Sequence, residues 1–158
     1  MKFDAKKQRH IMGKFATGVT VATTVVEGQN WGMTANAITS LSLDPPLMLL
    51  AVGRESQSHT MFQRGGCFAL NILSATQEEL SNRFASPAPR EFEDLRTKVG
   101  ETGAPILLDA LGWLDCKVVD VLPGGDHDIF IGEILEGDHQ EDGEPLIYFS
   151  GGYRRIAK

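Results

Sequence analysis

Hydrophobic and polar positions follow one another in short runs that predict strands more often than helices. Residues 19–26 are rich in β-branched side chains, and the polar turn at 27–30 connects them to a second strand-like run at 32–46. A continuously apolar run at 47–52 is typical of a buried strand, and residues 67–73 predict another. The β structure therefore begins with a hairpin.

The second half of the chain predicts further strands at 111–122, 128–135 and 145–150. The turn between the first two of these is Pro123-Gly124-Gly125, a combination that ends strands. Residues 86–105 are polar, carry prolines and show no clear period. They predict a long connection that lies over a site.

Two other segments show the period of a helix. Asp4 is placed to cap a first helix that ends at Gly18, with Ile11, Met12 and Phe15 near one face.

The second helix is predicted at residues 75–85, because Ser74 and Gln77 have the spacing of a capping box. Pro87 and Pro89 follow it and cannot continue a helix.

These elements predict a mainly β fold in a single domain, residues 1–158. Six to seven strands that do not alternate regularly with helices favour an antiparallel barrel or sandwich with two to three appended helices. A chain of 158 residues is long enough to bury a core without disulfides. Cys67 and Cys116 lie far apart in apolar runs, so we expect two buried thiols.

Charge and hydropathy restrict the partners. The net charge is −6 and no basic stripe is present, which argues against a nucleic-acid partner. No run approaches the roughly 18 to 20 apolar residues that span a bilayer, and the first residues lack the apolar segment of a secretory signal. We therefore expect a cytoplasmic protein that has no membrane partner.

Several catalytic motifs are absent from the sequence. It contains no GxSxG elbow, no Walker loop, no HExxH and no GxGxxG between a strand and a helix. A nicotinamide nucleotide would therefore not be held by a Rossmann unit. Metal binding is not expected either, because His127 and His139 stand at opposite ends of one predicted strand, roughly 30 Å apart at about 3.3 Å per residue.

Two clusters of short polar side chains remain as candidates for ligand binding. Residues 32–46 carry many hydroxyl and amide groups and almost no charge, which suits either a ligand groove or an ordinary strand. Ser56, Ser58 and Thr60 precede a possible helical turn, so they suit either a phosphate site or a simple helix cap. His127 begins an apolar strand, where an imidazole can stack on a planar ligand or remain an ordinary turn residue.

The ordered combination of these segments resembles the flavin reductase-like proteins with an FMN-binding split barrel, especially the small reductase components of two-component monooxygenases. The matching segments are 15–21, 32–46, 68–73, 77–85 and 125–133. The tripeptide Gly-Asp-His occurs twice, but only the copy at 125–127 is followed by the family's Ile-x-Ile-Gly-Glu pattern. The family's Arg-Phe-x-Gly step after the second helix is missing here, so no contact is predicted from residues 86–98.

The resemblance implies a homodimer of Greek-key split barrels, with flavin in a groove that both subunits shape. It assigns Thr34, Ala35 and Asn36 to the isoalloxazine edge and His127 to the face where NAD(P)H docks. The remaining residues implied for the groove are Thr39, Ser40 and Ser42 toward the ribityl chain and phosphate, Ser56, Ser58 and Thr60 in the phosphate region, and Phe84 at the groove's closure.

The activity implied by the resemblance is an NAD(P)H-dependent flavin reductase that transfers hydride to FMN or FAD and supplies a partner monooxygenase. One alternative is a non-enzymatic flavin-binding electron carrier or redox sensor on the same barrel. Another is a barrel that binds a different planar or phosphorylated ligand, such as haem or pyridoxal phosphate. The sequence does not distinguish FMN from FAD, or NADH from NADPH.

Overall fold

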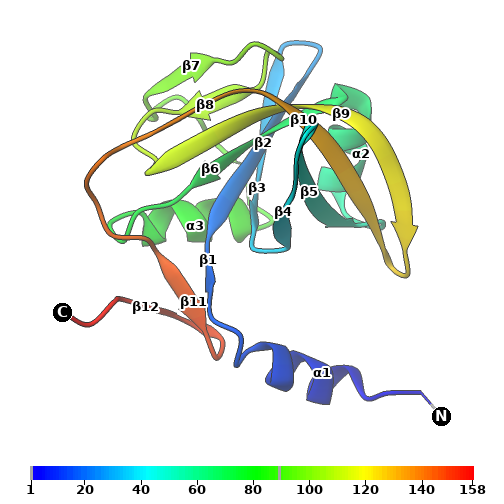
Figure 1. Cartoon of the computed structure of the whole chain (residues 1–158), viewed down its shortest axis with the longest axis vertical. Coiled ribbons are helices and arrows are strands. Elements are labelled where there is room, and N and C mark those ends of the chain that lie inside the picture. The colour runs from blue at the N-terminus through cyan, green and yellow to red at the C-terminus, as the bar shows by residue number, and fades with distance from the viewer. Residues whose placement is uncertain (1, 89) are drawn as a thin grey trace.

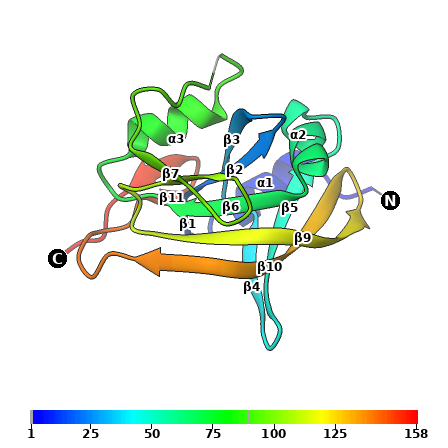
Figure 2. The ribbon, with the colours of Figure 1, turned by 90° about the horizontal axis from the view of Figure 1, so that it is seen from above.

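The computed structural model describes residues 2–88 and 90–158, so Pro89 lies outside the described residues. Its centre is a seven-stranded antiparallel sheet in the order β3-β2-β6-β9-β10-β5-β4, which curves round in Figures 1 and 2. The strands of this sheet are β2 (Thr20–Val26), β3 (Gln29–Ala35), β4 (Ile38–Leu43), β5 (Pro46–Gly53), β6 (Cys67–Ile72), β9 (Gly112–Gly124) and β10 (His127–His139). The expected mainly β, antiparallel fold is confirmed.

Side chains from both halves of the sheet pack into one core. Phe62, Phe68 and Phe130 are fully buried there together with Leu50, although they come from strands and helices far apart in the sequence. The two edge strands, β3 and β4, are consecutive in the chain but are not hydrogen-bonded to each other as strands. The sheet therefore encloses its core and stays open between these two edges.

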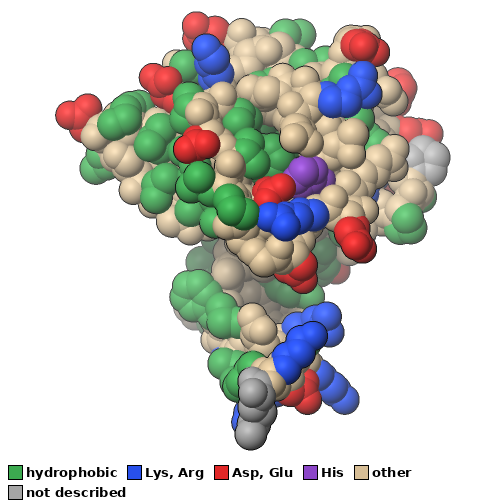
Figure 3. Space-filling model, turned by 90° about the vertical axis from the view of Figure 1, so that its right-hand side faces the viewer, with side chains coloured by type: hydrophobic (Ala, Val, Ile, Leu, Met, Phe, Trp, Pro, Cys, Tyr) green, Lys and Arg blue, Asp and Glu red, His purple; other side chains and the backbone are tan. Residues whose placement is uncertain are grey.

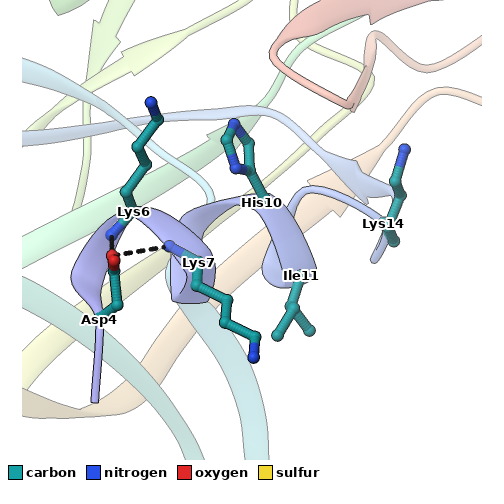
Figure 4. A pocket seen from close by; sticks show the side chains of 6 residues that line it. All are labelled: Asp4, Lys6, Lys7, His10, Ile11 and Lys14. Carbon is teal, nitrogen blue, oxygen red and sulfur yellow. Dashed lines mark hydrogen bonds between the residues drawn. The ribbon is translucent and has the colours of Figure 1, made fainter.

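Three helices accompany the sheet: α1 (Ala5–Met12), α2 (Gln57–Gly65) and α3 (Glu78–Ala85). The carboxylate of Asp4 caps α1, accepting hydrogen bonds from the backbone N–H groups of Lys6 and Lys7 (Figure 4). The prediction that this helix reaches Gly18 is wrong, because α1 ends at Met12 and the chain turns at Gly13. A two-residue strand, β1 (Thr17–Gly18), follows instead.

The helix α1 protrudes from the body of the molecule (Figure 1). None of its residues is buried, and Ile11, Met12 and Phe15 are each more than half exposed. Lys and Arg side chains gather beside hydrophobic ones on this protruding part in Figure 3, and Figure 4 shows Lys6 and Ile11 projecting to opposite sides of α1. In the described part of the chain, no helix combines the length and the apolar character needed to cross a bilayer.

The run at 32–46, expected to be one strand, is divided into two. The end of β3 at Ala35 and the start of β4 at Ile38 leave Asn36 and Ala37 outside the ladder. A second break follows at Asp44 and Pro45, after which Pro46 opens β5. The many short polar side chains of this run therefore lie on two edge strands and the break between them.

Two short hairpins were not predicted. Residues 86–105, expected to be a connection without structure, contain β7 (Thr97–Val99), which pairs with β8 (Pro105–Leu107). The predicted last strand is β11 (Ile147–Phe149), and it turns back into β12 (Gly152–Arg154). Together with β1 these two strands form a separate three-stranded sheet.

The helix α3 packs against β3 because Gly32 has no side chain. A Cβ atom at Gly32 would meet the Phe84 ring at 2.7 Å, far inside van der Waals contact. Phe84 is fully buried and its ring lies 5.1 Å from that of Phe92, centroid to centroid. This contact fixes α3 over the strand that ends at Ala35.

Both cysteines are buried free thiols, as expected. Burial raises the pKa of the Cys116 thiol to about 12, with a smaller contribution from the neighbouring Asp115. A thiol that stays protonated at neutral pH is a poor nucleophile. Cys116 is therefore part of the core packing.

Candidate ligand-binding site at one end of the sheet

The break between β3 and β4 opens onto a hollow lined by uncharged side chains. This hollow has a volume of about 250 Å³ and is lined by Val19, Thr34, Ala35, Asn36, Ser81, Ala85, Tyr148 and Tyr153. Thr34, Ala35 and Asn36 are the three residues assigned to the flavin ring edge by the resemblance. The structure brings them together with one face of α3 and with the C-terminal hairpin.

A larger hollow of about 1030 Å³ adjoins the first one. Asn36 and Tyr148 line both, and the larger hollow continues along Phe15, Thr17 and the end of α1. Its walls come from the N-terminal segment, the strand break and the β11–β12 turn. The two hollows together form a groove, which we call the strand-break groove.

Two backbone N–H groups in this groove have no partner within the chain. Among residues 2–88 and 90–158, no hydrogen bond is found from the backbone N–H of Asn36 or of Ala37. Both residues are exposed, and the carbonyl of Ala37 accepts a hydrogen bond from Ala51 N. Free backbone donors beside an uncharged hollow suit the carbonyl and ring-nitrogen acceptors of a planar heterocycle.

The side chains at the break are held in place by neighbours. The Thr34 hydroxyl donates to the carbonyl of Ser81 at 2.6 Å, and the Asn36 amide donates to the Thr17 hydroxyl at 3.2 Å. The Ser81 hydroxyl lies 2.7 Å from that of Tyr153. These bonds connect β3, α3 and the C-terminal hairpin around the groove.

Tyr148 and Tyr153 were missed by the sequence reasoning. Their rings make an edge contact with centroids 5.6 Å apart, and both rings line the smaller hollow. The only signal in the sequence was a pair of tyrosines on either side of Gly151-Gly152 near the end of the chain. That signal gains meaning only when the β11–β12 hairpin is known.

The residues predicted to continue toward the ribityl chain and phosphate lie along the edge strand β4. Thr39 and Ser40 are exposed and Ser42 is half-buried, with a bulge between Ser40 and Ser42 in the pairing with β5. The exposed side of this strand also carries Leu43, which is 91% exposed. The hydroxyls of β4 therefore continue from the strand-break groove along an open edge.

The second hydroxyl cluster forms the start of α2. The Ser56 hydroxyl caps the helix by accepting a hydrogen bond from His59 N, and the buried Ser58 hydroxyl accepts one from the indole N–H of Trp31. Thr60 is exposed. In this chain, two of the three hydroxyls therefore already have partners that explain their presence, while their role toward a phosphate stays a prediction.

Phe84, predicted to close the groove, lies beneath it. Its ring is fully buried among Val19, Leu73 and other core side chains. It supports α3, the helix that supplies Ser81 and Ala85 to the groove wall. A direct contact between Phe84 and a ligand in the groove stays a prediction.

His127 lies close to the β4 side of the strand break. Ala51 N donates to Ala37 O, Ala51 pairs with Ile129 on β10, and His127 pairs with Gly53 two positions further along. Neighbouring strands are about 4.8 Å apart, so the imidazole lies within a few strand spacings of the break. The ring is about half exposed.

The His127 imidazole is oriented by its neighbour in sequence. Its Nδ1 lies 2.8 Å from a carboxylate oxygen of Asp126, and this hydrogen bond keeps the pKa of Asp126 below its usual range. Among the described residues no hydrogen-bond partner of Nε2 is found. Such an arrangement can orient or stack on a planar ring, and it needs no general base.

No metal centre is indicated. Within the described residues, 2–88 and 90–158, no group of three or more His, Cys, Asp or Glu side chains is arranged to hold an ion. His127 and His139 open and close the same strand, β10.

Comparison with known proteins identifies the family. The model of the flavin reductase like domain matches residues 12–157, nearly the whole chain. A probable flavin reductase of Rhizobium meliloti is 40% identical over 96% of this chain, which spans about half (49%) of that longer protein.

Other relatives are matched over most of their length. An FMN reductase (NADH), SmoA, of Agrobacterium fabrum is 36% identical over 98% of this chain and 88% of its own length. The reductase component of a 4-nitrophenol 4-monooxygenase/4-nitrocatechol 2-monooxygenase of Rhodococcus opacus is 36% identical over 95% of this chain and 80% of its own.

A solved structure shows the same fold throughout. The NADH:FAD oxidoreductase SgcE6 of Streptomyces globisporus superposes with a TM-score of 0.90 at 36% identity, covering 100% of this chain and 98% of the other. The matching fold, the family model and the relatives agree with the segments that carry the resemblance. The chain belongs to the flavin reductase like family.

Proposed function

We propose that this protein is an NAD(P)H-dependent flavin reductase that reduces FMN or FAD and passes the reduced flavin to a separate oxygenase. The observation that carries the proposal is the strand-break groove, whose inner part is uncharged and bordered by the free N–H groups of Asn36 and Ala37. His127 lies two strands from the β4 side of the break, on the other side of β5. The named activities of the relatives support the same reaction.

The residues present fit a flavin. The isoalloxazine ring is planar and has acceptor atoms along one edge, which match the free donors of the break, and the tyrosine rings offer an apolar wall. The bound flavin accepts hydride from the nicotinamide and so supplies the reactivity. Thr34, Ala35 and Asn36 hold and orient its ring.

The polar side chains beyond the break would hold the remainder of the flavin. In this proposal the hydroxyls of Thr39, Ser40 and Ser42 follow the ribityl chain, and the start of α2 lies toward the phosphate. Neutral hydroxyls and amides give a weaker grip than arginine pairs do. A moderate affinity suits a flavin that must leave after reduction.

His127 is the residue assigned to the nicotinamide. Because Asp126 holds Nδ1, the imidazole can present its face and Nε2 to the nicotinamide ring or carboxamide. Its contribution is to place the hydride donor against the flavin. No side chain of the groove needs to act as an acid or base in hydride transfer.

We also propose that the protein works as a homodimer of split barrels. Leu41 and Leu43 on the edge strand β4 are exposed apolar side chains, and the exposed Met12 and Phe15 line the larger hollow. A second copy would cover them and complete the groove wall. Sedimentation equilibrium should give twice the chain mass, and a monomer would contradict this part of the proposal. A cytoplasmic location remains the prediction made from the sequence.

The activity is tested by steady-state oxidation of NADH and of NADPH, followed at 340 nm, with FMN, FAD and riboflavin in turn. We expect flavin-dependent turnover with at least one donor and one flavin. A protein that oxidises neither donor with any of these flavins would contradict the proposal. The absorbance spectrum of the purified protein separates flavin from haem or pyridoxal phosphate.

A further inference from the structure

A carboxylate next to His127 joins three elements at the tip of the β9–β10 hairpin. One oxygen of Asp128 lies 2.9 Å from Arg54 Nε, and the other lies 2.7 Å from His59 Nε2. The Asp128 and His59 side chains are only 18% and 12% exposed, whereas Arg54 is about half exposed. We call these three residues the tip cluster.

The tip cluster ties the hairpin to the chain between β5 and α2. Arg54 directly follows β5, His59 lies on α2, and Asp128 is the second residue of β10. Arg54 N also donates to the carbonyl of Asp126 at 3.0 Å. The hairpin tip is therefore fixed by a backbone bond and by both oxygens of one side chain.

The partners of Asp128 are themselves held in place. His59 N donates to the Ser56 hydroxyl, and the His59 ring makes an edge contact with Phe130 at 5.5 Å between centroids. The hydrogen bond from His59, followed by that from Arg54, keeps the pKa of Asp128 below its usual range. The carboxylate is thus ionised at neutral pH and remains an acceptor for both partners.

The cluster fixes the position of His127 without touching its ring. His127 stands between Asp126 and Asp128, and its imidazole lies over Gly53, with Cε1 and Nε2 about 3.9 Å from where a Cβ of Gly53 would be. If the tip of the β9–β10 hairpin moved away from β5, the His127 imidazole would no longer lie over Gly53. An ordinary exposed ion pair contributes little to stability, so the importance of the cluster lies in geometry.

We infer that Asp128 is a positioning residue, which acts through His59 and Arg54 to hold His127 where it meets the hydride donor. This inference rests on the proposed function of His127. It adds a residue from outside the strand-break groove to the machinery that binds the nicotinamide nucleotide. It also gives a role to the pairing of the largely buried His59 on α2 with Asp128 near the start of β10.

A double-mutant cycle tests the inference. Asp128→Asn should raise the KM for NADH about fivefold while kcat and the flavin dissociation constant change less than twofold. In a His127→Ala background the same substitution should leave the KM unchanged, because the residue it positions is gone. Equal effects in both backgrounds, or no effect in either, would overturn the inference.

Two further variants separate positioning from loss of structure. Asp128→Glu keeps the charge and should restore part of the KM. Asp138→Asn, at the other end of β10, is the matched control and should leave the KM unchanged. If Asp128→Glu behaves like Asp128→Asn, and Asp138→Asn raises the KM equally, the effect is general and the inference fails.

An NMR measurement tests the geometry independently of turnover. The imidazole signals of His127 should shift and broaden in Asp128→Asn but not in Asp138→Asn. Unchanged signals would overturn the inference even if the protein is an active flavin reductase. Conversely, a wild-type protein without turnover would contradict the proposed function while this measurement still decides the positioning role.

Discussion

The two ends of β10 carry the same tripeptide, Gly-Asp-His, in different surroundings. At the first end, His127 Nδ1 lies 2.8 Å from Asp126, and the following residue, Asp128, binds Arg54 and His59. At the second end, the His139 side chain is 71% exposed, and its one ion-pair partner among residues 2–88 and 90–158 is Glu141, at 3.7 Å. One tripeptide is anchored and the other is solvated.

This difference shows that the neighbours of a motif decide its role. The first tripeptide ends the turn between β9 and β10, and its histidine pairs with the end of β5, the strand that also pairs with β4 after the strand break. The second pairs only with the start of β9, at the far end of the ribbon. The sequence pattern after residue 127 distinguished them, and the structure supplies the physical reason.

The largest expected effect is on the kinetics of variants at the two histidines, His127 and His139. His127→Ala should lower kcat/KM for NADH about 10²-fold, because misplacement of a reactant costs that much. The flavin dissociation constant should change little. His139→Ala is the matched control, for which unchanged kinetics are expected. Equal kinetics for the two variants would remove the distinction between the two ends.

A smaller effect, on stability, is expected for a substitution at Gly132, which lies between the two ends of β10. A Cβ there would meet the Phe68 ring at 2.6 Å and Cys116 Cβ at 2.7 Å. Gly132→Ala should therefore lower the free energy of unfolding by about 2 kcal/mol, since overpacking a core costs about 1 to 3 kcal/mol. The measurement is urea denaturation.

The control for this variant is Gly18→Ala, where no atom lies within 4 Å of the new Cβ. It should change the unfolding free energy far less. At a temperature where Gly132→Ala is folded, its KM for NADH should match that of the wild type. A raised KM would show that strain in the strand reaches His127.

The smallest effect concerns pH. His127 lowers the pKa of Asp126, so the pair stabilises the fold above the unfolded pKa of about 3.9 and this contribution is lost as pH falls through the lower folded value. The Tm difference between wild type and Asp126→Asn should shrink as the pH falls below about 4. Asp138→Asn is the comparison at the other end. A difference that grows as the pH falls below about 4 would contradict the pairing.

Strands with a local signal were predicted well from the sequence. Residues 19–26, 47–52 and 67–73 correspond to β2, β5 and β6, where β-branched or continuously apolar side chains enter the core. The β9–β10 hairpin was also foreseen, although β10 continues to His139. Its additional residues are polar and exposed, so no hydrophobic pattern marked them.

Two errors in the prediction have different physical causes. The first helix was extended to Gly18 because this glycine is placed to end a helix and Ile11, Met12 and Phe15 fall near one face, whereas these side chains are exposed in the single chain. The β7–β8 hairpin is held partly by the buried Asn71, whose side-chain amide oxygen accepts a hydrogen bond from the backbone N–H of Leu107. A tertiary contact of this kind leaves no periodic signal nearby.

The candidate site was only partly predictable. The break at Asn36 and Ala37 lies inside a run whose composition suited a continuous strand, and its free N–H groups become visible only in the fold. Tyr148 comes from a hairpin that was not predicted. The assignments of residues to flavin and nicotinamide came from the resemblance and stay predictions.

The most direct test of the central claim is anaerobic mixing of the flavin-loaded protein with NADH in a stopped-flow spectrometer. We expect the flavin absorbance near 450 nm to bleach at a rate at least as fast as steady-state turnover. Bleaching at this rate would show that the protein catalyses hydride transfer. If the bound flavin stays oxidised while NADH and NADPH are in excess, the protein is a flavin carrier and the claim is contradicted.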